Sequence, residues 1–266
     1  LLNVLEERDV QIRGYKISLP LDLLLVASAN PEDYTNRGRI ITPLKDRFGA
    51  EIRTHYPVEL ADEVAVIGQE AHLLADVPEV LLEVLARFTR LLRESSAVDQ
   101  RSGVSARFAI AGAETMAASA LRRATIAAEQ VASARLVDLE AAVEVLVGKI
   151  EFETGEEGRE REILAHLLRQ ATAETIRGRL RGLDFRPLVD AMEAGAQVAT
   201  GVGVSGEEFL AALPPLNGSA LYDEAAARLG AETPERRAGA LELALEGLYL
   251  ARRIGKESAG RETVYG

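Results

Sequence analysis

Three polar residues occupy sequence positions from which they could act during the transfer of a phosphoryl group. The first of them is Asn30. It follows the apolar run of residues 21–27, which predicts a strand buried on both faces. In open α/β sheets, ligands bind beyond the carboxyl ends of the strands, and Asn30 is placed at such an end. A neutral amide there can donate to a γ-phosphate and orient the attacking water without adding charge. The alternative is that Asn30 and Pro31 only begin a turn.

Arg47 is the second candidate, and it follows the acidic Asp46. Phosphoryl transfer leaves negative charge on the equatorial oxygens, which a planar guanidinium can bind in a bidentate manner. An arginine in this role, often supplied by a neighbouring subunit, is called an arginine finger, and Asp46 would hold its side chain or loop. The alternative is a surface ion pair that flanks a core Phe48.

Arg107 is the third candidate, at the start of a helix that Ser105 is predicted to cap and that extends to about residue 123. Free N–H groups and the helix dipole favour an anion at such an end, so an arginine on this turn suits a phosphate. The alternative is a solvated surface arginine. A further run of arginines reads as a helix end with solvated charges: Arg177, Arg179, Arg181 and Arg186.

The elements that must position these residues change from strands to helices near residue 57. Residues 10–18 alternate around Arg13-Gly14, which predicts a β-hairpin before the strand of residues 21–27. After residue 57, apolar residues recur with helical spacing, and the clearest stripe is Leu81, Val84, Leu85, Phe88 and Leu92. We therefore expect a mostly α fold in which a few strands of an α/β core precede the helices.

Capping signals organise the C-terminal half. Residues 154–157 (TGEE) have the spacing of a capping box and predict a helix to about residue 181, and residues 205–208 repeat that spacing. Thr233-Pro234 places a cap and a first-turn proline before another amphipathic helix. Because the first of these signals follows a break, we expect residues 154–266 to form a helical domain that folds separately and binds a protein partner.

Composition excludes several classes of function. The net charge is −11, and residues 1–57 carry eight basic and eight acidic side chains, so the whole excess falls on residues 58–266. Such an acidic half argues against nucleic-acid binding, which needs clustered cations. The absence of Cys excludes disulfides, and three widely spaced His argue against a metal site. No apolar run reaches the roughly 18 residues of a membrane span, so we expect a soluble cytoplasmic protein.

A phosphate-binding loop is absent from the sequence. No G-x-x-x-x-G-K-[ST] occurs in the 266 residues, and the chain begins at Leu1 inside an apparent helix. We therefore expect this to be the C-terminal part of a larger protein. Alone it is not expected to hydrolyse ATP or to hold any cofactor tightly.

The motifs taken together resemble the AAA+ ATPases of the MoxR and magnesium-chelatase ATPase-subunit group. LLNVLEER (residues 1–8), VQIRGY (10–15), LLLVASANPED (23–33) and LKDRFG (44–49) occur in the order and spacing of that group. GVSARFAIAGAE (103–114) resembles the sensor-2 region of its helical lid. The resemblance covers about residues 1–153, and these motifs are specific only in combination. The two nucleotide-binding motifs of the group, Walker A (the phosphate-binding loop) and Walker B, are both absent from the 266 residues.

This resemblance implies a role for each candidate. Asn30 matches sensor 1, Arg47 the arginine finger and Arg107 sensor 2. The implied organisation is the C-terminal part of an AAA+ α/β core at residues 1–57, a helical lid at residues 58–153 and a helical accessory domain at residues 154–266. The implied cofactors are ATP and Mg²⁺ in the full-length parent. The implied partners are a homo-oligomeric ring, commonly a hexamer, and a protein with a metal-dependent adhesion-type domain.

Two hypotheses about function follow. The first is the sensor, finger and lid portion of an AAA+ ATPase, magnesium chelatase-like or MoxR-like, that couples ATP hydrolysis to remodelling of a partner protein or to metal insertion. The second is a non-catalytic helical scaffold or interaction module that retains AAA+ assembly surfaces. A transcription activator of the enhancer-binding kind is disfavoured, since it would need a basic recognition helix near the C-terminus, where residues 241–250 are acidic and apolar.

Overall fold

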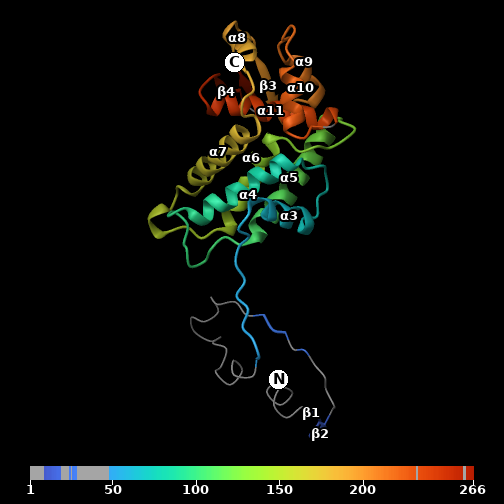
Figure 1. Cartoon of the computed structure of the whole chain (residues 1–266), viewed down its shortest axis with the longest axis vertical. Helices are drawn as coiled ribbons and strands as arrows, with labels where there is room; N and C mark the ends of the chain where they lie inside the picture. The colour runs from blue at the N-terminus through green and yellow to red at the C-terminus, as the bar shows by residue number, and fades with distance from the viewer. Residues whose placement is uncertain (1–8, 19–23, 25, 29–47, 232, 260–261) are drawn as a thin grey trace. The chain divides into compact units, whose positions relative to one another are not determined.

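The structure is a computed structural model, and it describes residues 9–18, 24, 26–28, 48–231, 233–259 and 262–266. The described residues form a mostly α fold with a few short strands (Figure 1), which confirms the predicted fold class. The chain divides into two compact units, Leu1–Tyr56 and Pro57–Gly266, which are described separately. In the described residues no helix combines the length and the apolar character needed to cross a membrane.

The first unit contains the predicted hairpin. Strand β1 (Asp9–Ile12) pairs antiparallel with β2 (Tyr15–Ser18), and Ile12 lies opposite Tyr15. The two turn residues, Arg13 and Gly14, have φ of 51° and 86°. Positive φ at both central positions is typical of the turn whose twist matches that of the strands. The strand predicted at residues 21–27 lies mostly outside the described residues, and its residues 24, 26 and 27 have no regular secondary structure.

The second unit begins with a bundle of four helices: α3 (Leu60–Glu70), α4 (Glu79–Glu94), α5 (Ala106–Ile126) and α6 (Leu136–Leu146). The apolar stripe predicted on α4 is buried along its whole length, which confirms that helix. Helices α4 and α5 meet through Phe88 and Phe108, whose ring centroids lie 5.7 Å apart. This contact fixes the rotation of the first turn of α5 about the helix axis.

The rest of the unit follows in this order: η2 (Val147–Lys149), η3 (Thr154–Glu156), α7 (Glu160–Arg179), α8 (Arg186–Glu193), β3 (Val198–Gly201), α9 (Gly206–Ala212), α10 (Leu221–Arg228), α11 (Pro234–Leu250), β4 (Lys256–Ala259) and β5 (Glu262–Tyr265). The three strands form an antiparallel sheet in the order β3-β5-β4, in which Val198 and Lys256 both lie opposite Tyr265. The sequence pattern predicts only helices in this region, so the sheet is a correction to that prediction. Strands of four residues are too short for their alternation to be recognised.

The predicted capping box at residues 154–157 is wrong, whereas the one at residues 205–208 is confirmed. Thr154 begins a 3-10 turn, and α7 starts only at Glu160 because Gly158 has φ 85°, which a helix cannot continue through. By contrast, the Ser205 hydroxyl accepts from the Glu208 N–H at 3.2 Å, and the Glu208 carboxylate accepts from the Ser205 N–H at 2.9 Å.

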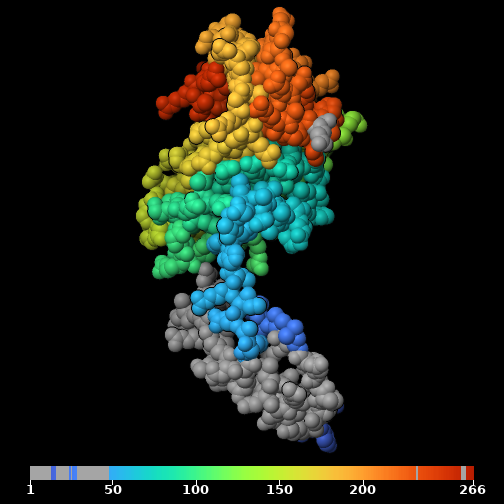
Figure 2. Space-filling model, in the orientation of Figure 1, coloured from blue at the N-terminus to red at the C-terminus, as the bar shows by residue number. Residues whose placement is uncertain are grey.

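Helix α7 packs along α4, on the other side of the boundary predicted between residues 153 and 154. Arg179 donates from Nε to Glu83 at 2.8 Å and from its terminal nitrogen to Glu79 at 3.0 Å, so it is not the solvated charge expected from the sequence. In the view of Figure 2, the surface of residues 57–266 continues without a gap from α4 across α7 to the last helices. That residues 154–266 fold separately stays a prediction. If they were separated from the preceding residues, the surfaces of α4 and α7 that pack together would become exposed to solvent.

Helices α7 and α11 cross closely at a glycine, which gives a first testable prediction. A Cβ added to Gly247 would lie 2.5 Å from Ile176 Cγ2, on a branched side chain with little freedom to move. We expect Gly247→Ala to destabilise the protein, because overpacking costs about 1–3 kcal/mol while helix propensity offsets about 1 kcal/mol. Urea unfolding measures this difference.

Gly178→Ala is the matched control, since it changes a helical glycine of α7 with nothing within 4 Å of the added Cβ. This variant should be stabilised by up to about 1 kcal/mol through helix propensity alone. Equal effects of the two substitutions would contradict the close approach at Gly247.

Candidate functional site

Of the three residues predicted to act on phosphate, one lies in the described part of the chain. Asn30 and Arg47 lie outside the described residues, so their roles stay predictions. Arg107 lies on the first turn of α5, and its side chain is exposed. The structure therefore does not bring the three residues together or separate them.

The start of α5 leaves its N–H groups without an acidic neighbour. Ser105 is the N-cap residue in extended conformation, as the sequence predicts, but its side chain makes no capping hydrogen bond, and no acidic residue occupies the first turn. Phe108 and Ala109 are buried, which directs Arg107 outward. Arg107 forms no hydrogen bond or ion pair with the residues that the structure describes. An exposed cation thus lies at a helix N-terminus that has no acidic side chain in its first turn, where an anion is favoured.

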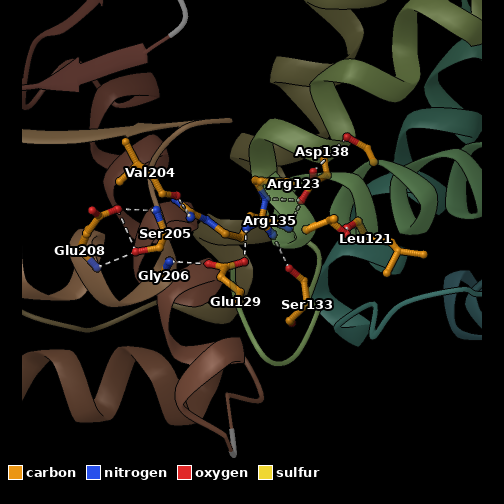
Figure 3. Close-up of polar contacts among 12 residues, drawn as sticks. Leu121, Arg123, Glu129, Ser133, Arg135, Asp138, Val204, Ser205, Gly206 and Glu208 are labelled. Carbon is orange, nitrogen blue, oxygen red and sulfur yellow. Dashed lines mark hydrogen bonds and ion pairs between the residues drawn. The ribbon is translucent and has the colours of Figure 1, made fainter. Parts of the chain in front are cut away.

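Arg123, near the other end of α5, is the centre of a buried polar cluster (Figure 3). Its Nε donates to Asp138 at 3.2 Å, and its two terminal nitrogens donate to Glu129 at 2.8 Å and to the Ser133 carbonyl at 2.6 Å. Only 1 % of Arg123 and of Asp138 is exposed. Every nitrogen of the guanidinium that can donate therefore has an acceptor, which a buried charge requires.

Arg135 extends this cluster from the N-cap of α6 to the C-terminal part of the chain. Its Nε donates to Glu242 on α11 at 2.8 Å, one terminal nitrogen to the Thr200 hydroxyl on β3 at 2.7 Å, and the other to the Val204 carbonyl at 2.9 Å. The guanidinium carbon also lies 5.3 Å from the ring centroid of Phe209 on α9. One side chain thus contacts α9, α11, β3 and the loop before α9.

The electrostatics of the cluster follow from burial and pairing. Burial raises the pKa of the Asp138 carboxyl, although Arg123 opposes the shift. Burial lowers the pKa of Arg135, but Glu242 and the other nearby carboxylates more than offset this, so its pKa is raised overall. Each charge therefore depends on its partner, and removing one leaves the other buried and uncompensated.

A second group of charges joins α6 and α11 to the sheet. Glu246 accepts from Lys256 Nζ at 2.8 Å and from the Tyr265 hydroxyl at 2.6 Å, and Glu140 on α6 lies 3.6 Å from Lys256. Burial lowers the pKa of Lys256, while Glu246 and Glu140 raise it above its ordinary value. Burial is also the main reason why the pKa of Tyr265 is raised.

A pocket of about 420 Å³ opens beside Arg123 and Arg135, between the α5–α6 loop and the starts of α9 and α11. Its size is that of a small-molecule site. Both arginines in its lining already donate to buried partners, so neither is left unbonded for a phosphate. Within the described residues, no group of three or more His, Cys, Asp or Glu side chains could hold a metal ion.

Asp76 links the loop before α4 to the start of α11. Its carboxylate accepts two hydrogen bonds from Arg236, at 2.8 and 2.6 Å, and one from the Ser133 hydroxyl at 3.0 Å. The hydrogen bonds from Arg236 are the main reason why the pKa of Asp76 lies below its ordinary value of 3.8, and burial opposes them. Because the pKa is lowered in the folded state, this contact stabilises the protein above pH 3.8 and its contribution is lost as the pH falls below that value.

We expect Asp76→Asn to lower the free energy of unfolding at pH 7 by about 1–2 kcal/mol, since the contact is charge-assisted but partly exposed. The difference from the wild type should shrink as the pH falls below 3.8, as urea unfolding across pH values would measure. Asp223→Asn, in an exposed ion pair with Arg237, is the control and should cost less than 1 kcal/mol. A difference that persists unchanged into acid would contradict a charge-dependent link.

The buried cluster is absent from the features predicted from the sequence, although one signal for it is present. Glu242 and Glu246 interrupt the otherwise apolar stretch of residues 238–250 at helical spacing, so one face of α11 carries two carboxylates inside the core. Arg123 and Arg135 carry no comparable signal, because exposed arginines are common on helices and at their ends.

Comparison of the chain with family models, with curated proteins and with solved structures finds no match. The resemblance to AAA+ ATPases therefore stays a prediction from the motifs.

Proposed function

We propose that this chain supplies the sensor, arginine-finger and lid portion of an AAA+ ATPase of the MoxR or magnesium-chelatase type. In that role Asn30 and Arg47 act on the γ-phosphate, and Arg107 binds the nucleotide from the lid. ATP hydrolysis in a ring then drives remodelling of a partner protein or insertion of a metal.

One observation carries this proposal: Arg107 is exposed on the first turn of α5, within the bundle of helices α3 to α6. Phe108 is buried against Phe88, so the turn that presents Arg107 is held by the core of the bundle. A bond from Arg107 to a phosphate would therefore act on the whole helix and not on a loose side chain. The β1–β2 hairpin, which forms where the VQIRGY motif predicts a hairpin, gives further support.

The cofactors of this function are ATP and Mg²⁺, bound by the full-length parent, and the first partner is a second copy of the chain in a ring. We place the protein in the cytoplasm, and we propose a protein client with a metal-dependent adhesion-type domain. Neither nucleic acid nor a membrane has a role in this proposal.

An ATPase of this kind needs a phosphate-binding loop and an acidic Walker B strand in the same polypeptide. We therefore expect the reading frame upstream of Leu1 to encode G-x-x-x-x-G-K-[ST] followed by a Walker B motif. Sequencing that frame tests the proposal directly. A complete frame without either motif would leave the alternative, a helical scaffold that retains AAA+ assembly surfaces.

One observation favours that alternative. In the buried clusters of residues 57–266, the arginines and Lys256 are already bonded to carboxylates of the same chain, as expected where charges serve structure. The two candidates differ in their dependence on ATP: a scaffold would capture its partner equally well with and without nucleotide.

The role of Arg107 gives a prediction that uses the full-length protein. We expect Arg107→Ala to weaken the dependence of lid position on nucleotide, so that ATP- and ADP-bound states differ less in hydrogen exchange across α5. The control is Arg122→Ala, an exposed arginine on the same helix about 22 Å further along. Equal exchange differences in the Arg107→Ala variant and the wild type would contradict a sensor role.

A further inference from the structure

We propose that Arg135 is a positioning residue that makes the α3–α6 bundle and the C-terminal segment, residues 198–266, open and move as one body. The basis is its place at the N-cap of α6, from which it reaches three acceptors in the C-terminal segment, namely Glu242, Thr200 and the Val204 carbonyl. At most 2 % of the Arg135 or Glu242 side chain is exposed. No other described side chain of the bundle has three such bonds to that segment.

Arg135 is itself held firmly in the bundle (Figure 3). Its backbone N–H donates to the Asp138 carboxylate at 3.0 Å, and the same carboxylate accepts from Arg123 on α5. Ser119, also on α5, donates to Asp138 at 3.0 Å. An unbroken series of hydrogen bonds therefore connects α5, through the start of α6, to the interior of the C-terminal segment.

Three further links join the same two parts around Arg135. The Glu129 carboxylate accepts from the Gly206 N–H at 2.6 Å. The other two are the Asp76–Arg236 contact described above and the approach of Lys256 to Glu140 at 3.6 Å. These links lie nearer the surface than Arg135, so we assign them a supporting role.

Noncovalent links matter here because the chain between the two parts contains two turns that could act as hinges. Gly182 and Gly195 both have positive φ, 83° and 99°, and a Cβ added at either would meet nothing within 4 Å. Buried ion pairs add little net stability compared with apolar residues of the same size. A polar network at this place is better explained by the single orientation that it imposes on the two parts.

This coupling deepens the proposed function, on which its consequence rests. If nucleotide moves α5 through Arg107, the bonds of Arg135 would carry that movement to the C-terminal segment, where a client could bind. The coupling itself needs no nucleotide, so it is tested on the chain alone and can fail or succeed independently of the ATPase.

The experiment is native-state hydrogen exchange of residues 1–266 in low concentrations of urea. In the wild type we expect amides of α5, α6, β3 and α11 to exchange through one common opening. The variant Arg135→Met/Thr200→Val/Glu242→Leu replaces the polar contacts by apolar side chains of similar size. In this variant we expect the C-terminal segment to exchange at least about ten-fold faster than α5 and α6.

Asp223→Asn/Arg237→Gln, which removes an exposed ion pair inside the C-terminal segment, is the control and should keep the common opening. Arg135→Lys keeps the charge but cannot span three acceptors, so it should show a smaller separation in the same direction. Separate openings in the wild type, or a common opening in the triple variant, would overturn the proposal. If the triple variant does not fold, Arg135→Lys decides: a common opening in it would overturn the role of Arg135.

Discussion

Arg123→Met is expected to lower the free energy of unfolding by about 3–5 kcal/mol, the largest loss of stability that we predict for a single substitution. The physical reason is that the carboxyl of Asp138, which is 1 % exposed, would be left in the core without the guanidinium that pairs with it. The Ser133 carbonyl and Glu129 would lose their donor as well. Urea unfolding followed by circular dichroism measures the loss, and an unchanged m value would show that the folded state is retained.

Arg122→Met is the matched control, because it makes the same change at the neighbouring, exposed position of α5. Its effect should stay within about 0.5 kcal/mol. The double variant Arg123→Met/Asp138→Leu removes both buried charges and should recover part of the loss, since apolar replacement of a whole buried pair is often tolerated. An Arg123→Met variant as stable as Arg122→Met would show that the cluster is not buried in solution.

Arg47→Ala, in the full-length parent of the proposed ATPase, is expected to lower ATP turnover by a factor on the order of 10³ or more with ATP affinity little changed. An arginine finger contacts charge that develops only in the transition state, so its loss affects the rate and not ground-state binding. Steady-state turnover and nucleotide titration separate the two quantities. Full turnover in the variant would mean that Arg47 forms a surface ion pair.

Two controls make this test specific. Arg53→Ala removes a nearby arginine whose side chain is 90 % exposed and pairs only loosely with Glu51, at 3.5 Å, so turnover should change little. Mixing Arg47→Ala subunits with subunits defective in Walker B should restore some activity, if the finger acts on the nucleotide of a neighbouring subunit. No recovery on mixing would place the action of Arg47 within its own subunit.

The sequence by itself determined the local elements whose signals are contained in a few consecutive residues. The Arg13-Gly14 turn, the Ser205–Glu208 capping box and the Thr233 cap, whose side chain accepts from the Arg236 N–H, all form as predicted. The apolar stripes of α4 and α11 are buried. These features depend on backbone dihedrals and helical spacing, which neighbouring residues set almost alone. The helix start predicted at residues 154–157 is wrong, although these residues have the spacing of a capping box. The reason is that Gly158, one residue later, adopts a left-handed conformation in which the helix cannot continue.

Only the tertiary structure decided what the charged residues do. Arg123 and Arg135 look like ordinary surface residues in the sequence, and they are buried because elements as far apart as α5, α6 and α11 meet around them. The sheet β3-β5-β4 likewise depends on pairing between residues near 200 and near 260. A buried charge is tolerated only when the fold places a partner of opposite sign beside it. The spacing of residues along the sequence does not show which distant residues the fold brings together.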